Sequence, residues 1–303
     1  MPVRISRRAF AFSAISAISA GAGWMTAGHR LMAAEKADTQ LKMGMLQGMF
    51  RDVPPAMVQA LSKPFRELIQ KQTGFTGDVD LCKEPIELVN KLREKKVHIG
   101  VFHGFEFAWA QKLCPELQPI VVTMPVGNKV QAMVVVNQEC KFTQLADLAD
   151  ECVAIPRGAK AHALAYLEKQ RARLPKTCAK PVTKLNLAPD EILGAVASGE
   201  VTAALVDIGA FEGYQTLQPG VFKQLKILHQ SEMFPQAVVA YPKGAISESD
   251  AQRLRDGLAT ANQTTSGKMM MTLWNLKGFE VPPADYQQRL DAILKAYPLP
   301  VSN

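Results

Sequence analysis

One stretch of this chain, residues 97–110, constrains the fold more than any other. It reads VHIGVFHGFEFAWA, a short apolar segment that stops at a His-Gly pair and continues with helical character. A strand that is apolar on both faces is typical of a parallel sheet covered by helices on each side. Ligands of open α/β sheets bind beyond the carboxyl ends of the strands. The stretch therefore predicts an α/β fold with a site near residues 103–107.

A second stretch, residues 201–211, repeats this pattern. It reads VTAALVDIGAF, so that Val201 corresponds to Val97 and Asp207 corresponds to His103. Two strands that end in equivalent loops indicate two similar lobes, each of which offers one loop to a shared cleft.

Hydrophobic periodicity and turn residues predict the other elements. Strands are expected at 41–46, 78–81, 130–137, 153–155, 182–185 and 236–241. Helices are expected at 54–73, from Pro85, and at 161–174, 190–197, 249–262, 266–276 and 283–297. The right-handed crossover rule turns the alternating order into mostly parallel sheets. We expect a discontinuous first lobe (35–132 plus 236–303), an inserted second lobe (133–235), and a hinge made of the two strands that cross between them.

Residues 1–34 have the three parts of an export signal, namely a basic start, an apolar run and small residues before the cleavage point. The run is too short and too rich in Ala, Ser and Gly to predict a membrane span. Arg7-Arg8 resembles a twin-arginine signal, and an ordinary signal with a chance arginine pair stays open. No Cys precedes Cys82, so no acyl anchor is expected at the cleavage point. We expect a soluble periplasmic protein.

The formal charge of +7 overstates the basic character of the mature chain. Residues 1–34 hold four arginines and no acid, which leaves 31 basic and 28 acidic residues, or +3. No run of Lys and Arg alternates with aromatic residues, and this argues against nucleic acid as a partner.

Five cysteines occur without a C-x-x-C pair, which argues against zinc-ribbon or thioredoxin-like chemistry. Disulfides are the expectation outside the cytoplasm. Cys152 and Cys178 are the preferred pair because both are predicted at the same edge of one sheet. Cys140 competes for either partner, and the odd count leaves at least one free thiol. The remaining cysteines are Cys82 and Cys114.

The order of elements resembles the periplasmic substrate-binding proteins of ABC transporters, in their phosphate/phosphonate-binding branch. The segments that match are 96–107, 142–148 with 153–155, 198–201, 231–235, and 278–279 with 285–286. The resemblance implies a two-lobed periplasmic-binding fold, a monomer that captures a small oxyanion, and permease subunits in the inner membrane as partners. The departures fall on the ligand site. The family's tyrosine at the first-lobe loop is Phe107, and its Ser/Thr run is replaced by PRGAKAH at 156–162.

The segment 156–162 brings basic residues to the start of a predicted helix, where free N–H groups and the helix dipole favour an anion. Arg157, Lys160 and His162 are therefore candidates for an oxyanion clamp, with Arg able to grip two ligand oxygens. The alternative is a solvated basic loop. Arg51, just past the first strand, is a further candidate.

The loops that follow the two organising strands supply the other candidates. Three roles are open for His103: it contacts the ligand, it accepts a hydrogen bond from the loop, or it has no role in the site. Asp207 binds an amine or hydroxyl of the ligand, or caps the next helix. Glu106 is a candidate contact or an ordinary acid of a first helical turn. Phe107 is a candidate wall for an apolar part of the ligand, or a core residue.

Motifs for catalysis are missing from the sequence, which has no G-x-S-x-G, no H-E-x-x-H and no phosphate-cradling loop with Lys-Ser/Thr. We therefore expect a binding protein and not an enzyme, with no cofactor and no metal. A ligand-sensing partner of a membrane receptor and an enzyme on the same scaffold are the alternatives.

Overall fold

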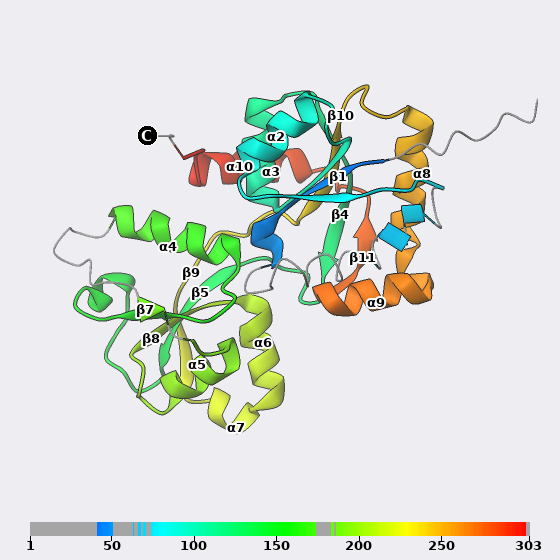
Figure 1. Ribbon diagram of the computed structural model, residues 1–303. Coiled ribbons are helices and arrows are strands. Elements are labelled where there is room, and N and C mark those ends of the chain that lie inside the picture. Colours follow the sequence, from blue (N-terminus) through cyan, green and yellow to red (C-terminus); the bar gives the residue numbers. More distant parts are fainter. Residues whose placement is uncertain are drawn as a thin grey trace, which may run out of the picture. The chain divides into compact units, whose positions relative to one another are not determined.

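The computed structural model describes residues 41–50, 63, 66, 67, 69, 70, 74–173, 183, 184 and 186–300. Within this part of the chain the strands form a six-stranded and a five-stranded sheet (Figure 1). This arrangement confirms the predicted α/β class with two sheets. The predicted export signal and Arg51 lie outside the described residues.

The first sheet has the strand order β11-β4-β10-β3-β1-β2. Its strands are β1 (Met43–Leu46), β2 (Val79–Cys82), β3 (Ile99–Phe102), β4 (Leu117–Pro125), β10 (Val238–Pro242) and β11 (Leu276–Glu280). Strand β1 pairs in parallel with β2 and β3, whereas β10 pairs antiparallel with β3 and β4, and β11 antiparallel with β4. Strand β4 is not predicted from the sequence, because Pro119 argues against a strand there. Pro119 lies opposite Ala240 at a register shift, where an irregular ladder tolerates a residue without an N–H.

The second sheet has the strand order β7-β6-β8-β5-β9. Its strands are β5 (Ala132–Asn137), β6 (Val153–Ile155), β7 (Thr183–Lys184), β8 (Ala203–Asp207) and β9 (Leu225–Gln230). Strand β6 is parallel to β7 and β8, and β5 is antiparallel to β8 and β9. Strand β9 is not predicted from the sequence either, because it is an edge strand whose side chains are mostly exposed or half-buried and whose apolar pattern is therefore weak.

Helices cover both faces of the first sheet, as the doubly apolar strands predict. On one face Leu46 and Phe102 pack in a cluster with Leu88 and Leu290, and on the other Met45 packs in a cluster with Leu254 and Met270. The helices of the first face are α2 (Pro85–Arg93), α3 (Gly104–Leu113) and α10 (Tyr286–Ala296), and those of the second are α8 (Glu248–Ala259) and α9 (Thr265–Trp274). Figure 1 shows the two groups on opposite faces.

The second sheet is covered in the same way. Val134 and Leu205 pack in a cluster with Tyr166, whereas Val135 packs in another with Ile192. The helices are α4 (Ala161–Arg173), α5 (Pro189–Ala197), α6 (Ile208–Leu217) and the short α7 (Pro219–Phe222). Three short 3-10 helices complete the described part, namely η1 (Gln47–Phe50), η2 (Leu145–Leu148) and η4 (Ala261–Gln263).

The chain passes between the two sheets twice, at residues 126–131 and 231–237, and hydrogen bonds join these two connections. Gln131 Nε2 donates to the Ser231 carbonyl at 2.6 Å, and the Phe234 N–H donates to the Val130 carbonyl at 2.8 Å. The Ala132 N–H donates to Ser231 Oγ at 2.9 Å. The strands that the sequence predicts to cross between the lobes correspond to β5 and β10. In the structure each of them belongs to one sheet, β5 to the second and β10 to the first. The lobe boundaries at 132/133 and 235/236 stay a prediction.

Candidate ligand-binding site

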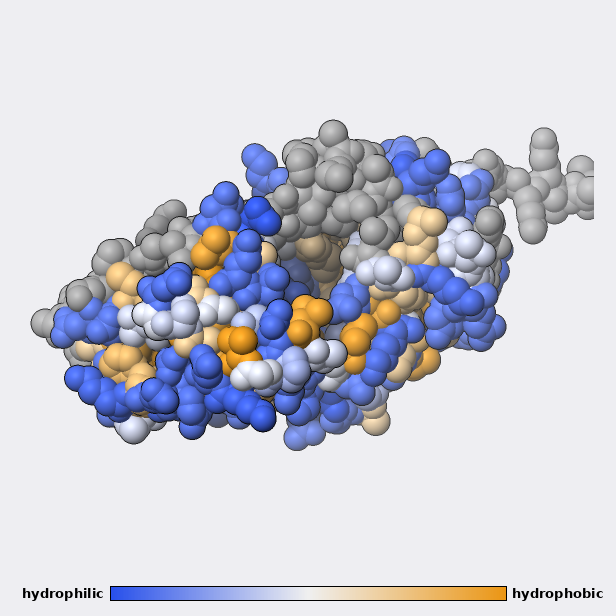
Figure 2. All heavy atoms as spheres, turned by 90° about the horizontal axis from the view of Figure 1, so that it is seen from below, coloured by the Kyte–Doolittle hydropathy of each residue, from blue (hydrophilic) through white to orange (hydrophobic). Residues whose placement is uncertain are grey.

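A cavity of about 310 Å³ is lined by residues of both sheets and of both connections between them. Its walls come from η1, the end of β4, the first turns of α3, α4 and α6, both connections, and the end of α9. In the space-filling view the surface is hollowed near its centre, and hydrophilic and hydrophobic residues both border the hollow (Figure 2). A cavity built from two lobes and their connections is a suitable site for a small ligand.

Three helices begin at this cavity. Residues His103–Phe105 at the start of α3, Lys160 and His162 at the start of α4, and Asp207–Gly209 at the start of α6 all line it. Each helix N-terminus carries a partial positive charge and N–H groups without a partner inside the helix. The convergence of these ends favours a negatively charged ligand at the starts of α3 and α4, whereas N–H groups at the start of α6 already bind the Asp207 carboxylate. It also confirms the predicted equivalence of His103 and Asp207, since each is the N-cap of the helix after its strand.

Lys160 and Asp207 form an ion pair across this wall, with Lys160 Nζ 2.9 Å from Asp207 Oδ1. The same oxygen accepts from the Gly209 and Ala210 N–H groups, at 3.0 and 3.3 Å. Burial raises the pKa of the Asp207 carboxyl, but the Lys160 charge and these hydrogen bonds outweigh burial and leave the pKa below its usual value. Asp207 therefore caps α6 as an anion, and the half-exposed Lys160 brings a positive charge to the cavity.

His162 lies in the first turn of α4 and is 4% exposed. Its Nε2 is buried and has no hydrogen-bond partner among the described residues. Burial lowers the pKa of the imidazole to about 3, with Asp207 raising it and Lys160 and His103 lowering it further. His162 is therefore a neutral ring at neutral pH, and it does not supply the positive charge that the sequence analysis expects of it.

His103 and Glu106 interact within the first turn of α3. His103 Nδ1 lies 2.6 Å from Glu106 Oε2, and the His103 backbone N–H donates to the same oxygen at 3.4 Å. His103 lines the cavity, whereas Glu106 does not. Through these two contacts Glu106 orients His103 without lining the cavity itself, as an acidic residue in the first turn of a helix commonly does.

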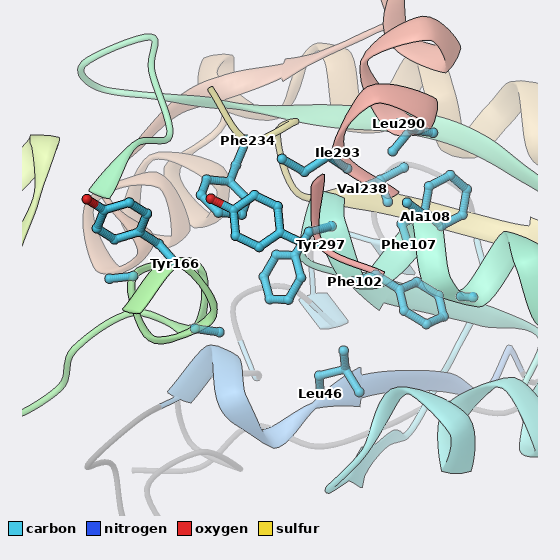
Figure 3. Packing of buried hydrophobic residues seen from close by; sticks show 14 of the residues in the cluster. Leu46, Phe102, Phe107, Ala108, Tyr166, Phe234, Val238, Leu290, Ile293 and Tyr297 are labelled. Atoms are coloured by element: carbon cyan, nitrogen blue, oxygen red, sulfur yellow. The ribbon is translucent and has the colours of Figure 1, made fainter. Parts of the chain in front are cut away.

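The structure brings Lys160, His162, His103 and Asp207 together at one cavity, and it leaves Arg157 and Phe107, like Glu106, outside it. Arg157 is exposed and does not line the cavity. Phe107 is 0% exposed and belongs to the core cluster, with its ring 5.9 Å from that of Phe102. Figure 3 shows Phe107 in the core beside Ala108.

The cavity also has walls that the sequence analysis did not identify. Lys129 and Gln131 come from the first connection, Phe234 from the second, and Trp274 from the end of α9. The Phe234 ring is central: it lies 5.4 Å from His162, 5.7 Å from Phe105 and 4.8 Å from Tyr297, between ring centroids. Phe234 and Tyr297 lie side by side in Figure 3. Phe234 lies in segment 231–235, which resembles the family, and this resemblance could have identified it as a candidate.

Neither metal sites nor disulfides appear in the part of the chain that the structure describes. No group of three or more His, Cys, Asp or Glu side chains there could hold a metal ion. The described cysteines form no disulfide with one another; they are Cys82, Cys114, Cys140 and Cys152. Cys178, the preferred partner of Cys152, lies outside the described residues, so that pairing stays a prediction.

Gly104 allows α3 to begin against the second connection. A methyl group there would lie 2.7 Å from the Gln236 carbonyl oxygen and closer still to that of Pro235. We expect Gly104→Ala to lower the free energy of unfolding by about 1–3 kcal/mol, because backbone atoms on both sides must move. Chemical denaturation measures this change.

The control for this variant is Gly213→Ala, also in a helix that begins at the cavity. Gly213 is exposed in α6, and a methyl group there would meet nothing within 4 Å. Alanine at this position is expected to raise the free energy of unfolding by about 0.5–1 kcal/mol, because it restricts the unfolded chain. If both variants shift stability equally, the contact of Gly104 with residues 235 and 236 has no energetic role.

Two α/β sheets joined by two connections, with a ligand-sized cavity at the junction, define the class of periplasmic binding proteins. Residues 48–286 match the family described as the periplasmic substrate-binding protein of ABC phosphonate transporters, and the chain belongs to this family. Members of the family bind a small-molecule substrate for an ABC transporter outside the cytoplasm. This confirms the function inferred from the sequence. No helix in the described ranges is long and apolar enough to cross a membrane.

Solved structures show the same fold at low sequence identity. A binding protein component of an ABC phosphonate transporter from Pseudomonas aeruginosa is 15% identical, with a TM-score of 0.55 over 84% of this chain and 85% of that one. PhnD1 from Prochlorococcus marinus, in complex with methylphosphonate, is 14% identical, with a TM-score of 0.57 over 84% and 97%. A Xanthomonas citri protein bound to ATP is 15% identical, with a TM-score of 0.61 over 85% and 96%. No curated protein matches this sequence.

Proposed function

We propose that this chain captures a small phosphonate-like oxyanion in the cavity and delivers it to an ABC importer. The observation that carries the proposal is the convergence of three helix N-termini on one cavity, together with the Lys160 ammonium. Helix N-termini bind anions, phosphate-like groups among them, through their free N–H groups. The convergence replaces the Ser/Thr run that the family resemblance leads one to expect at 156–162.

The ligand also carries an organic substituent. Part of the cavity wall is apolar and comes from Met49, Phe105, Val126, Phe234 and Trp274. Apolar side chains of this kind gain free energy when they cover carbon atoms of a ligand, and they gain nothing from an inorganic oxyanion. An alkylphosphonate has both the anionic and the apolar part that such walls fit.

The remaining parts of the proposal concern the mature protein. The Arg7-Arg8 segment, which lies in the export signal that is removed from the mature protein, supports export by a twin-arginine-type route, in which a receptor reads the signal. The protein acts in the periplasm as a soluble monomer and releases its ligand chemically unchanged.

A thermal-shift screen of the purified protein tests the function. The panel holds methylphosphonate, longer alkylphosphonates, phosphate, phosphite, carboxylates and amino acids. A ligand at about 100 times its dissociation constant adds about 2.7 kcal/mol to the free energy of unfolding, which raises the melting temperature by several degrees. We expect the largest shift from an alkylphosphonate, and phosphorus NMR should show it unaltered after incubation. A shift with carboxylates or amino acids alone would overturn the proposal.

A further inference from the structure

His103 is a cavity residue with one ring nitrogen held by the protein and the other one open. Its Nδ1 atom lies 2.6 Å from Glu106 Oε2, and the same oxygen accepts from the His103 backbone N–H. The other ring nitrogen, Nε2, makes no hydrogen bond to any residue that the structure describes, and it is not buried, unlike Nε2 of His162. Nε2 of His103 therefore reaches solvent and can take a ligand oxygen as its partner.

The surroundings of the ring place this open nitrogen at the cavity. Glu106 holds the Nδ1 edge and does not line the cavity, whereas His103 does line it. The Phe105 ring, another part of the cavity wall, stacks on the imidazole with 6.0 Å between the ring centroids and 21° between the planes. One edge and one face of the imidazole are thus occupied. Nε2 lies on the opposite edge, so it is the polar atom that the His103 side chain offers to a ligand.

The contact with Glu106 decides which hydrogen the ring carries. An ionised carboxylate only accepts hydrogen bonds, so Nδ1 of His103 is the donor and holds a hydrogen. A neutral ring of this kind has a lone pair at Nε2. An oxyanion oxygen would meet that lone pair with no hydrogen between the two atoms. One additional proton between Nε2 and the ligand oxygen turns the contact into a charge-assisted hydrogen bond.

The charges around the ring act in opposite directions. The titratable groups that share the cavity with His103, in the described part of the chain, are Lys129 from the first connection and Lys160, His162 and Asp207 from the helix starts of the second sheet. The lysines and the positive end of α3 disfavour a positive ring while the cavity is empty. Glu106 favours it: its side chain is only 12% exposed, and it forms no salt bridge with a described Lys or Arg. A phosphonate dianion beside Nε2 adds negative charge and shifts this balance toward the protonated ring.

We propose that His103 binds the ligand oxyanion through a protonated Nε2, so that capture of a phosphonate dianion takes up one proton from solvent. This inference rests on the proposed function, and it adds the residue that makes ligand binding depend on pH. The proton comes from water or buffer and lies between Nε2 and one phosphonate oxygen. The other oxygens accept from Lys160 and from the N–H groups at the starts of α3 and α4. When the ligand leaves, the proton returns to solvent.

The first test is calorimetric titration of the wild-type protein with methylphosphonate, in two buffers that differ in their enthalpy of ionisation. The pH is kept above the second pKa of methylphosphonate, where the free ligand is a dianion and a histidine of ordinary pKa is neutral. The difference between the two observed enthalpies gives the number of protons taken up, and we expect about one for each ligand bound. Because a proton enters with the ligand, the affinity should fall about tenfold for each further pH unit.

The second test assigns the proton to His103. In His103→Gln the side-chain amide can still donate to Glu106, but no group of this side chain titrates. We expect the variant to bind methylphosphonate without proton uptake, with an affinity that no longer falls over this pH range. His98→Gln is the matched control, because His98 lies just before β3, accepts from the Lys42 N–H at 3.0 Å and does not line the cavity. Its replacement should leave the proton uptake unchanged.

Glu106 acts through His103, and Glu106→Gln tests this positioning role. The glutamine oxygen can still accept from Nδ1 of His103, but the variant lacks the negative charge that favours a positive ring. We therefore expect the fall in affinity to begin at a lower pH than in the wild-type protein. A purely structural role of Glu106 would leave the shape of this pH profile unchanged. Melting temperatures of the ligand-free variants show whether all of them are folded.

The possible outcomes separate this inference from the proposed function. Binding of methylphosphonate by the wild-type protein without proton uptake overturns the inference and leaves the oxyanion site intact. Proton uptake that persists in His103→Gln also overturns it, because another group then holds the proton. Failure of every alkylphosphonate to bind overturns the proposed function itself. Should His103→Gln fail to fold, the wild-type measurement and the pH profile of Glu106→Gln still decide the question.

Discussion

Replacing Lys160 by methionine should weaken the binding of methylphosphonate by about 10- to 150-fold. A hydrogen bond to a charged group contributes about 1.5–3 kcal/mol, which corresponds to this range. The substitution keeps most of the aliphatic stem but removes the ammonium group. It also leaves the Asp207 carboxylate, 2.9 Å from Nζ in the wild-type protein, without its counter-ion at the wall of an anion site. Calorimetric titration measures the loss.

Arg157→Ala is the matched control. Arg157 is basic and lies three residues before Lys160, but its side chain is exposed and lies off the cavity. We expect its replacement to change the affinity by less than about twofold, as for a charge screened by solvent. A loss from Arg157→Ala as large as that from Lys160→Met would show that long-range charge, and not contact with the cavity, sets the affinity.

Replacing Phe107 by alanine is expected to lower the free energy of unfolding by about 3–5 kcal/mol, without changing the affinity of the folded protein for methylphosphonate. Phe107 is fully buried in the core of the first sheet, so its truncation leaves a cavity between α3 and its neighbours. Urea denaturation gives the stability change, and titration at a temperature where the variant is folded gives the affinity.

A pair of milder substitutions supports this prediction if Phe107→Ala does not fold. Phe107→Leu should destabilise the protein and leave the affinity unchanged. Phe105→Leu should weaken binding, because Phe105 lines the cavity. Loss of affinity in Phe107→Leu, with the fold intact, would mean that Phe107 acts on the ligand after all.

The contrast between Phe105 and Phe107 illustrates what the sequence can and cannot predict. The strand–loop–helix pattern at 97–110 places the start of α3 at the site, because a helix that follows a parallel strand begins at the ligand edge of the sheet. Two residues along a helix turn the side chain by about 200°. Phe105 and Phe107 therefore cannot both face the cavity, but the sequence does not say which one does. In the structure Phe105 lines the cavity and packs on Phe234, a residue more than a hundred positions later in the chain, whereas Phe107 packs on Phe102 in the core.

The same limit applies to the basic loop before α4. The sequence predicts positive charge at this helix start, and Lys160 meets that expectation. Arg157 does not, because the backbone N–H of Arg157 is bonded to the Leu187 carbonyl and the loop turns its side chain to solvent. His162 reaches the cavity, but burial removes the charge expected of it. Lys129 and Gln131 could not be predicted as cavity residues, because they lie in an irregular connection that has no hydrophobic periodicity.

The hydrogen bonds between the two connections have a mechanical consequence. Hydrogen bonds join the two segments at successive points, from Gln131 and Ala132 to Ser231 and from Phe234 to Val130. One segment therefore cannot slide along the other without breaking several hydrogen bonds at once. We therefore expect the two connections to move together as one hinge, about which the sheets rotate. Val130 and Phe234 of these connections also line the cavity. A ligand in the cavity would then contact the hinge directly, and its binding energy would act on the angle between the sheets.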